Sequence, residues 1–144
     1  MDRLLNNHFA GLDIEILTKA RILSEADVGK TFYLDLATGF TVTLPRMLNS
    51  RTSFPLKFVV KTAPASGTYV ITENTQFDTD TILVNGINEL DVDTGDNGPY
   101  STGCTTITFA DGVAVAGDWF VLDRDGTKWY CTGQTNADGG ITLA

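Results

Sequence analysis

The sequence predicts an all-β protein, an antiparallel β-sandwich or jelly-roll-like barrel with an extended N-terminal arm. Many short segments alternate apolar and polar residues with a period of two, as half-buried strands do. Glycine, asparagine, aspartate and proline interrupt these segments at short intervals, and only 19% of the residues are charged. A chain of 144 residues is the size of one domain with one core. We therefore expect an arm and lead-in turn over residues 1–28, followed by a β-sandwich domain over residues 29–144.

The first twelve residues are too apolar for an ordinary disordered tail, yet they follow neither a helical nor a strand period. Fully extended, they would reach about 40 Å, far enough to touch a neighbouring subunit. Two interpretations stay open: an arm folded back on its own domain, or an arm that binds another protein surface. In the second, the contacts come from the four large apolar residues Leu4, Leu5, Phe9 and Leu12.

Residues 13–23 are compatible with a strand or a helix, because Ile14 and Ile16 follow a strand period while other apolar residues have helical spacing. We expect a strand, since strand-like segments follow. Residues 24–29 predict one helical turn. Ser24 is its N-cap, Asp27 at the third position completes the capping box, and Gly29 ends the turn.

Residues 30–45 predict a central β-hairpin. Two runs alternate apolar with polar residues, and only Ala37, Thr38 and Gly39 join them, a number that suits a hairpin loop. Pro45 cannot donate to a ladder and marks the end of the second strand. The apolar face of this hairpin consists of Phe32, Leu34, Leu36, Phe40, Val42 and Leu44.

The middle of the chain predicts strands over residues 56–63, 68–72 and 81–92, with inward side chains at alternate positions. Pro55 opens the first of these, and residues 64–67 turn the chain into the second. Asn85-Gly86 marks a tight turn or a bulge within the third. The expected inward residues are Leu56, Phe58, Val60, Tyr69 and Ile71.

The last third predicts a strand over residues 105–109, a hairpin over residues 119–132 and a short strand at Ile141 and Leu143. A two-residue Asp125-Gly126 turn would place three pairs opposite one another: Asp123 with Lys128, Leu122 with Trp129, and Phe120 with Cys131. The hairpin would then be apolar on both faces, so a loop or another subunit has to cover the second one. The interface candidates on that second face are Trp119 and Tyr130.

The net charge of −8 disfavours direct nucleic-acid binding, because an acidic surface repels phosphate. No apolar run is long enough to span a membrane, and the N-terminus lacks the pattern of a secretory signal. We expect a soluble protein made in the cytoplasm. Cys104 and Cys131 belong to no metal-binding motif and are expected to be reduced and packed.

No pattern in the sequence points to catalysis, a metal or a cofactor, and we predict a protein that is not an enzyme. The single histidine, His8, lies in the arm, where a rigidly placed general base is not expected. The DVDTGDNG run over residues 91–98 fails the calcium-loop pattern, because Asp96 and Thr102 occupy the sixth and twelfth places. A hydrolase would need a converging pair of acids, and the sequence nominates none.

Aromatic residues outside the expected core have two interpretations. They could stack on sugar rings, as in carbohydrate-binding modules, or they could belong to the core or a subunit interface, which we favour. The residues are Tyr33, Tyr100, Trp119 and Tyr130.

Two groups of motif residues resemble a pattern common in structural proteins of tailed-phage virions. The opening "turn, Gly-Lys, strand, Thr-Leu-Pro" corresponds to Asp27, Gly29-Lys30 and residues 43–45. The closing hairpin corresponds to Gly117-Asp118, Leu122, Asp125-Gly126 and Trp129. The resemblance spans about residues 17–143 and implies a β-sandwich displayed on a virion, commonly as a homotrimer.

Within that family, the absence of a repetitive shaft favours a head decoration (capsid cement) protein, made late in infection, over a fibre. The resemblance implies a non-enzymatic protein on the outer capsid surface that binds the major capsid protein lattice and stabilises the shell. The alternative is a fibre or spike module that binds host surface glycans.

Overall fold

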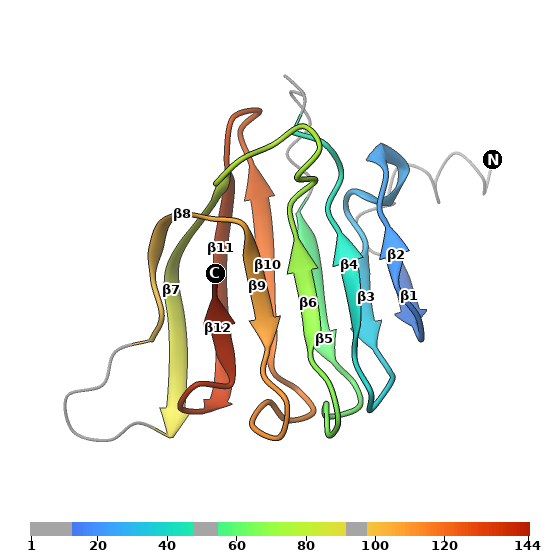
Figure 1. Cartoon of the computed structure of the whole chain (residues 1–144), viewed down its shortest axis with the longest axis vertical. Helices are drawn as coiled ribbons and strands as arrows, with labels where there is room; N and C mark the ends of the chain where they lie inside the picture. Colours follow the sequence, from blue (N-terminus) through green and yellow to red (C-terminus); the bar gives the residue numbers. More distant parts are fainter. Residues whose placement is uncertain (1–12, 48–54, 92–97) are drawn as a thin grey trace.

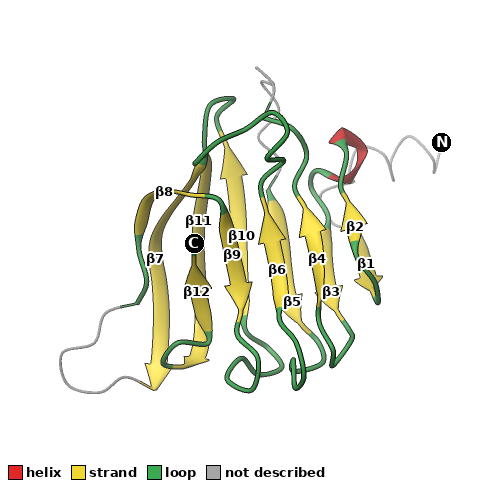
Figure 2. Ribbon diagram, viewed as in Figure 1, coloured by secondary structure: helices red, strands yellow, loops and turns green. Residues whose placement is uncertain are grey.

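The computed structural model describes residues 13–47, 55–91 and 98–144, and shows two β-sheets packed face to face (Figure 1). The predicted all-β, sandwich-like fold class is confirmed. One single-turn 3-10 helix, η2 (Glu25–Asp27), is drawn in red in Figure 2. The core between the sheets contains Phe32, Leu34, Val42, Phe58, Tyr69, Ile71, Phe109, Phe120, Leu122 and Trp129, all fully buried.

The wider sheet, sheet A, has the order β1-β3-β5-β10-β11-β7-β8. Its strands are β1 (Ile14–Leu17), β3 (Thr31–Leu34), β5 (Leu56–Val60), β10 (Trp119–Arg124), β11 (Trp129–Ala137), β7 (Ile82–Asp91) and β8 (Ser101–Cys104). Sheet B has the order β12-β9-β6-β4-β2. Its strands are β12 (Ile141–Leu143), β9 (Thr106–Phe109), β6 (Tyr69–Thr72), β4 (Phe40–Thr43) and β2 (Arg21–Ile22).

The predicted central hairpin over residues 30–45 is wrong. β3 belongs to sheet A and β4 to sheet B, so the residues between them form an arch across the core. An apolar period of two is the same whether two strands pair edge to edge or face each other across a core. The pattern therefore located both strands correctly but could not assign them to a sheet.

Both sheets are mixed rather than purely antiparallel. β1, β3 and β5 are parallel neighbours in sheet A, and β2, β4 and β6 are parallel neighbours in sheet B. The chain alternates between the sheets along this part of the molecule, which Figure 1 shows as a blue-to-green progression. The later strands β9 and β10 join their sheets antiparallel.

Two successive arches stack through backbone contacts that require glycine. A Cβ atom on Gly67 would lie 2.1 Å from the carbonyl oxygen of Thr38. Gly39 has φ +67, and its Cβ atom would lie 2.1 Å from the carbonyl oxygen of Thr68. The amide of Ala65 donates to the carbonyl of Ala37 at 2.8 Å and joins the same two arches.

The strand conformation expected within residues 13–23 is confirmed, but the segment forms two short strands, β1 and β2, one in each sheet, rather than one. The predicted turn at Ser24 is also confirmed: the Ser24 amide donates to the Asp27 carboxylate at 2.9 Å, and Gly29 has φ 94. The segment that the sequence grouped with the arm therefore supplies strands to both sheets from Ile14 onward.

An ionic cluster lies beside β1 and β2. Arg21 bonds Glu15 and also Asp27, the latter at 2.7 Å, and Lys30 Nζ lies 3.2 Å from Glu15 and 3.1 Å from Asp27. Asp27 is only 4% exposed, so its two cationic partners compensate a buried charge. This cluster joins β1, β2, η2 and the start of β3.

The β10–β11 hairpin forms, but its predicted register is wrong by two residues. Leu122 pairs with Cys131 instead of Trp129, Asp123 with Tyr130 instead of Lys128, and Phe120 with Gly133 instead of Cys131. The turn is longer than two residues because Asp125 Oδ1 accepts bonds from the amides of Thr127 and Lys128, both at 2.8 Å. The Lys128 amide, followed by the Thr127 hydroxyl and amide, holds the pKa of Asp125 well below its usual range. A two-residue shift preserves the face of every side chain, so the predicted faces are correct.

Other predicted elements are confirmed. The inward positions of β5, β6 and β9 are buried as expected, and the predicted short terminal strand forms as β12, with Ile141 buried. Asn85-Gly86 forms a bulge inside the continuous strand β7, with Gly86 at φ 96. Cys104 and Cys131 are buried free thiols, and burial raises the pKa of both.

Candidate functional site

The outward face of sheet A carries a row of large apolar side chains. Strand pairing places Ile16 beside Tyr33, Tyr33 beside Val59, and Val59 beside Trp119. Their chain neighbours Phe32, Phe58 and Phe120 are fully buried, so alternation turns this row away from the core. Four strands from distant parts of the sequence thus build one surface.

A second row lies beside the first. It consists of Ile14, Thr31, Lys57, Val121 and Thr132, which are consecutive partners across the same sheet. Lys57 Nζ lies 5.0 Å from the centre of the Trp119 ring, so this cation is held against an aromatic face. We call the apolar members of both rows the apolar outer face: Ile14, Ile16, Tyr33, Val59, Trp119 and Val121.

Six of the ten outward positions in these two rows are apolar. Five strands about 4.8 Å apart, with two outward positions about 6.7 Å apart on each, cover roughly 300 Å². Patches of this size on soluble proteins are often interaction sites. Ile14 and Ile16 are 66% and 52% exposed, so the apolar outer face is most open at the β1 edge.

The structure places the predicted interface residues Trp119 and Tyr130 on this same face of sheet A, in different rows. Tyr130 pairs with Asp123 and Leu83 and is 41% exposed. Its hydroxyl donates to Asp125 Oδ2 at 2.8 Å, and this bond raises the Tyr130 pKa. The other predicted interface residues, Leu4, Leu5, Phe9 and Leu12, lie outside the described residues.

Sequence reasoning missed most of the apolar outer face. Tyr33, Val59 and Val121 lie between buried positions of their strands. These strands therefore carry apolar residues at inward and at outward positions. Apolar residues on both faces of a strand indicate that both faces of its sheet are covered. This pattern was recognised only in the hairpin that contains Trp119.

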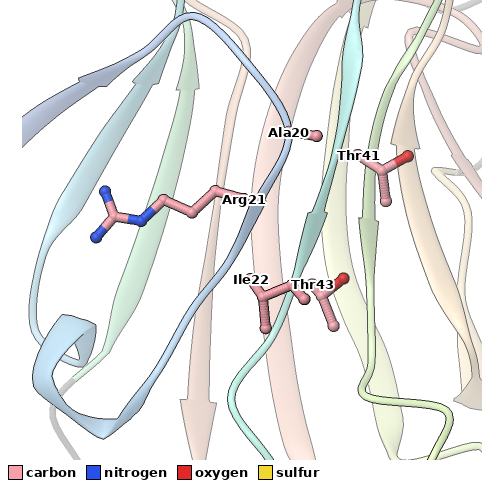
Figure 3. A pocket seen from close by; sticks show the side chains of 5 residues that line it. All are labelled: Ala20, Arg21, Ile22, Thr41 and Thr43. Atoms are coloured by element: carbon pink, nitrogen blue, oxygen red, sulfur yellow. The ribbon is translucent and has the colours of Figure 1, made fainter.

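A shallow groove lies on the outward face of sheet B, between β2 and β4 (Figure 3). Ile22, Thr41 and Thr43 line it, and Ile22 is 75% exposed. Figure 3 shows the Arg21 side chain extending away from these three. Its guanidinium instead bonds Glu15 and Asp27. The groove therefore offers small apolar and hydroxyl groups without a charge.

A second cleft, about 340 Å³ in volume, lies between β7 and β8 at the opposite edge of sheet A. Its lining residues are Leu83, Val84, Asn85, Tyr100, Ser101 and Thr102. Neither of these two clefts is lined by a carboxylate.

The buried carboxylates Glu73 and Asp118 serve structural hydrogen bonds. Glu73 accepts from the amides of Asp80 and Thr81, both at 2.8 Å. Asp118 accepts from the amides of Val115 and Asn136 and from the Thr135 hydroxyl, at 2.9 to 3.0 Å. Each fixes a turn, which explains why the fold tolerates a buried acid there.

Among the residues that the structure describes, no group of three or more histidine, cysteine, aspartate or glutamate side chains could hold a metal ion. Most of the DVDTGDNG run and His8 fall outside those residues. In the same part of the chain, no helix has the length and hydropathy needed to cross a membrane.

No family model matches the chain, and no curated protein or solved structure is significantly similar to it. A function therefore has to be argued from the surfaces described above.

Proposed function

We propose that this chain is a non-enzymatic structural protein of a tailed-phage virion, which binds the major capsid protein lattice on the outer capsid surface. It acts as a decoration protein that self-associates, as a homotrimer, and adds contacts between neighbouring capsid subunits. These contacts oppose the outward pressure of packaged DNA. The motif resemblance and the chemistry of the apolar outer face support this proposal.

The single observation that carries the proposal is the apolar outer face, and its occupant is a second copy of this chain. The patch of roughly 300 Å² is more than a third of the ~800 Å² that each partner buries in an interface of standard size. The neutral residues Thr132 and Gln134 extend the two rows on β11, and the neutral Thr31 lies within the second row.

Charge also favours a second copy. The protein carries a net charge of −8, yet none of the ten outward positions in the two rows is acidic, and Lys57 lies among them. Two copies can therefore approach through this face without placing carboxylates against each other. Asp123 occupies the next outward position after Val121 on β10, where it can pair with Lys57 of the neighbouring copy.

The use of buried acids supports a non-enzymatic role. Glu73 and Asp118 each accept bonds from backbone amides, and Asp27 is held by two cations, so these three carboxylates are committed to the fold.

Attachment to the capsid is assigned to the apolar residues of the N-terminal segment, Leu4, Leu5, Phe9 and Leu12. Deletion of residues 1–12 removes no described strand, because β1 begins at Ile14. We expect the protein that lacks residues 1–12 to keep the thermal unfolding midpoint of the full chain and, in light scattering, its oligomeric state. It should fail to sediment with DNA-filled capsids of the phage whose genome encodes the chain.

Two results would contradict this function. If the protein that lacks residues 1–12 still saturates the capsids, this segment does not attach the protein to them. If the full-length protein neither binds capsids nor self-associates, the proposal as a whole is refuted. Electron microscopy of a decorated particle would locate the bound copies.

A further inference from the structure

We propose that the cleft between β7 and β8 binds a neutral saccharide unit, a hexose or N-acetylhexosamine of a surface polysaccharide, with Tyr100 as the stacking platform. This site lies at the opposite edge of sheet A from β1, where the apolar outer face is most open. It is therefore independent of the self-association proposed above.

Two bulges beside adjacent parts of β7 shape the cleft. β8 pairs with β7 only at Ile82–Cys104 and Val84–Ser101, so Thr102 and Gly103 together oppose Leu83. On the other side of β7, Asn85 and Gly86 together oppose Thr132 of β11. Bulges redirect side chains and interrupt the hydrogen-bond ladder, and they occur often beside binding sites.

The Tyr100 ring is the most exposed aromatic side chain at this site, at 78%. An exposed tyrosine beside an apolar wall offers a flat surface on which the C–H face of a sugar ring can stack. Leu83 provides part of that wall, and Tyr130 lies beside Leu83 on the next strand. Trp119, another of the four aromatics considered for sugar stacking from the sequence, is partly buried with Lys57 over its ring and is the poorer platform.

The polar groups of the cleft are neutral and can both donate and accept. Asn85 supplies an amide, and Ser101 and Thr102 supply hydroxyls. The Ser101 oxygen accepts from the Gly103 amide at 3.1 Å, which fixes this side chain at the bulge. Groups of this kind match vicinal sugar hydroxyls, which also donate and accept.

Two other ligand classes fit less well. A peptide strand added to the β8 edge would need a long, regular edge, whereas β8 has four residues and a bulge. An anionic ligand would need a cation, and no lysine or arginine lines the cleft. Lys128 Nζ donates to the backbone carbonyls of the lining residue Thr102 and of Asp80, at 3.2 and 3.4 Å.

The test is saturation-transfer NMR of the full chain with methyl glycosides of glucose, galactose, mannose, N-acetylglucosamine and N-acetylgalactosamine. Sialic acid and a sulfated galactose serve as the anionic arm, and a peptide of β-strand-forming residues as the third arm. We expect saturable binding of at least one neutral sugar with a Kd of roughly 1 mM, as suits a shallow site. Amide shifts should cluster at residues 83–85 and 100–103.

Tyr100→Ala should weaken binding at least about tenfold, since stacking on one ring supplies much of the contact. Tyr100→Phe keeps the ring and should keep binding within about threefold. Phe77→Ala is the matched control, because Phe77 is another exposed aromatic, 53% exposed, that lies over Arg46 away from the cleft. Equal unfolding midpoints of the variants show that folding is intact.

Three outcomes would overturn the proposal. The first is no saturable binding of any neutral sugar, and the second is wild-type affinity in Tyr100→Ala. The third is binding of the anionic sugars or the peptide alone, which would reassign the cleft to that class.

Discussion

Arg124 and Glu25 are 99 positions apart in the chain and form a bidentate ion pair. Arg124 Nη1 donates to Oε1 of Glu25 at 2.8 Å, and Nη2 donates to Oε2 at 2.6 Å. The Arg124 side chain is fully buried and its guanidinium carbon lies 5.5 Å from the centre of the Trp129 ring. The pair ties η2 to the end of β10 and thereby closes one end of the sandwich.

Glu25→Gln is expected to destabilise the protein by about 1 kcal/mol at neutral pH, because it replaces the charged carboxylate that pairs with the buried Arg124 guanidinium by a neutral amide. The loss stays at the low end of the range because Glu25 is 46% exposed and water screens its charge. Urea unfolding followed by fluorescence measures this difference. A variant as stable as wild type at pH 7 would show that the pair contributes nothing.

The same pair predicts a pH dependence. The hydrogen bond from Arg124 lowers the pKa of Glu25 from its ordinary value of 4.5. A lowered folded-state pKa stabilises the fold above the unfolded value, and this stabilisation disappears as pH falls through the folded value. The stability difference between wild type and Glu25→Gln should therefore be full at pH 6 and shrink below pH 4.5. A constant difference down to pH 3 would contradict this assignment.

Tyr69→Phe is expected to cost about 1–3 kcal/mol of unfolding free energy. The Tyr69 hydroxyl donates to the Thr62 carbonyl at 2.7 Å and accepts from the Leu36 amide at 2.8 Å, so it joins both arches. Tyr33→Phe is the matched control, since the Tyr33 hydroxyl has no hydrogen-bond partner in the described part of the chain, and it should change stability by less than ~0.5 kcal/mol. Equal losses in the two variants would refute a special role for Tyr69.

Gly67→Ala should destabilise the protein by about 2–4 kcal/mol, because the new methyl group would meet the Thr38 carbonyl at 2.1 Å. Ser66→Ala, at an exposed position of the same turn, should be nearly neutral. Thermal unfolding compares the two. A stable Gly67→Ala protein would mean that the arches do not stack as described.

Val59→Glu tests the apolar outer face. It places a carboxylate between Tyr33 and Trp119 and should convert the oligomer to monomer in light scattering. Val70→Glu makes the same change on β6, the central strand of sheet B, and should leave the oligomer intact. Should both variants remain oligomeric, the second copy does not bind through the apolar outer face.

Local sequence determined most of the strands and which side of each is buried, but it did not predict β8. In residues 56–60, alternation alone marks Leu56, Phe58 and Val60 as core, and the structure agrees. The turn at Ser24 followed from capping chemistry, which acts over three residues. Even with the wrong register, the faces of the β10–β11 hairpin were correct, because a shift of two preserves them.

Tertiary structure decided how these strands combine. Nothing in residues 30–45 distinguishes a hairpin from an arch, because the choice depends on Gly67 and Tyr69, which belong to the next arch. The apolar outer face likewise exists only because pairing brings Ile16, Tyr33, Val59 and Trp119 into one row. Periodicity reports the environment of each residue along its own strand, whereas strand order is set by contacts between segments far apart in the chain.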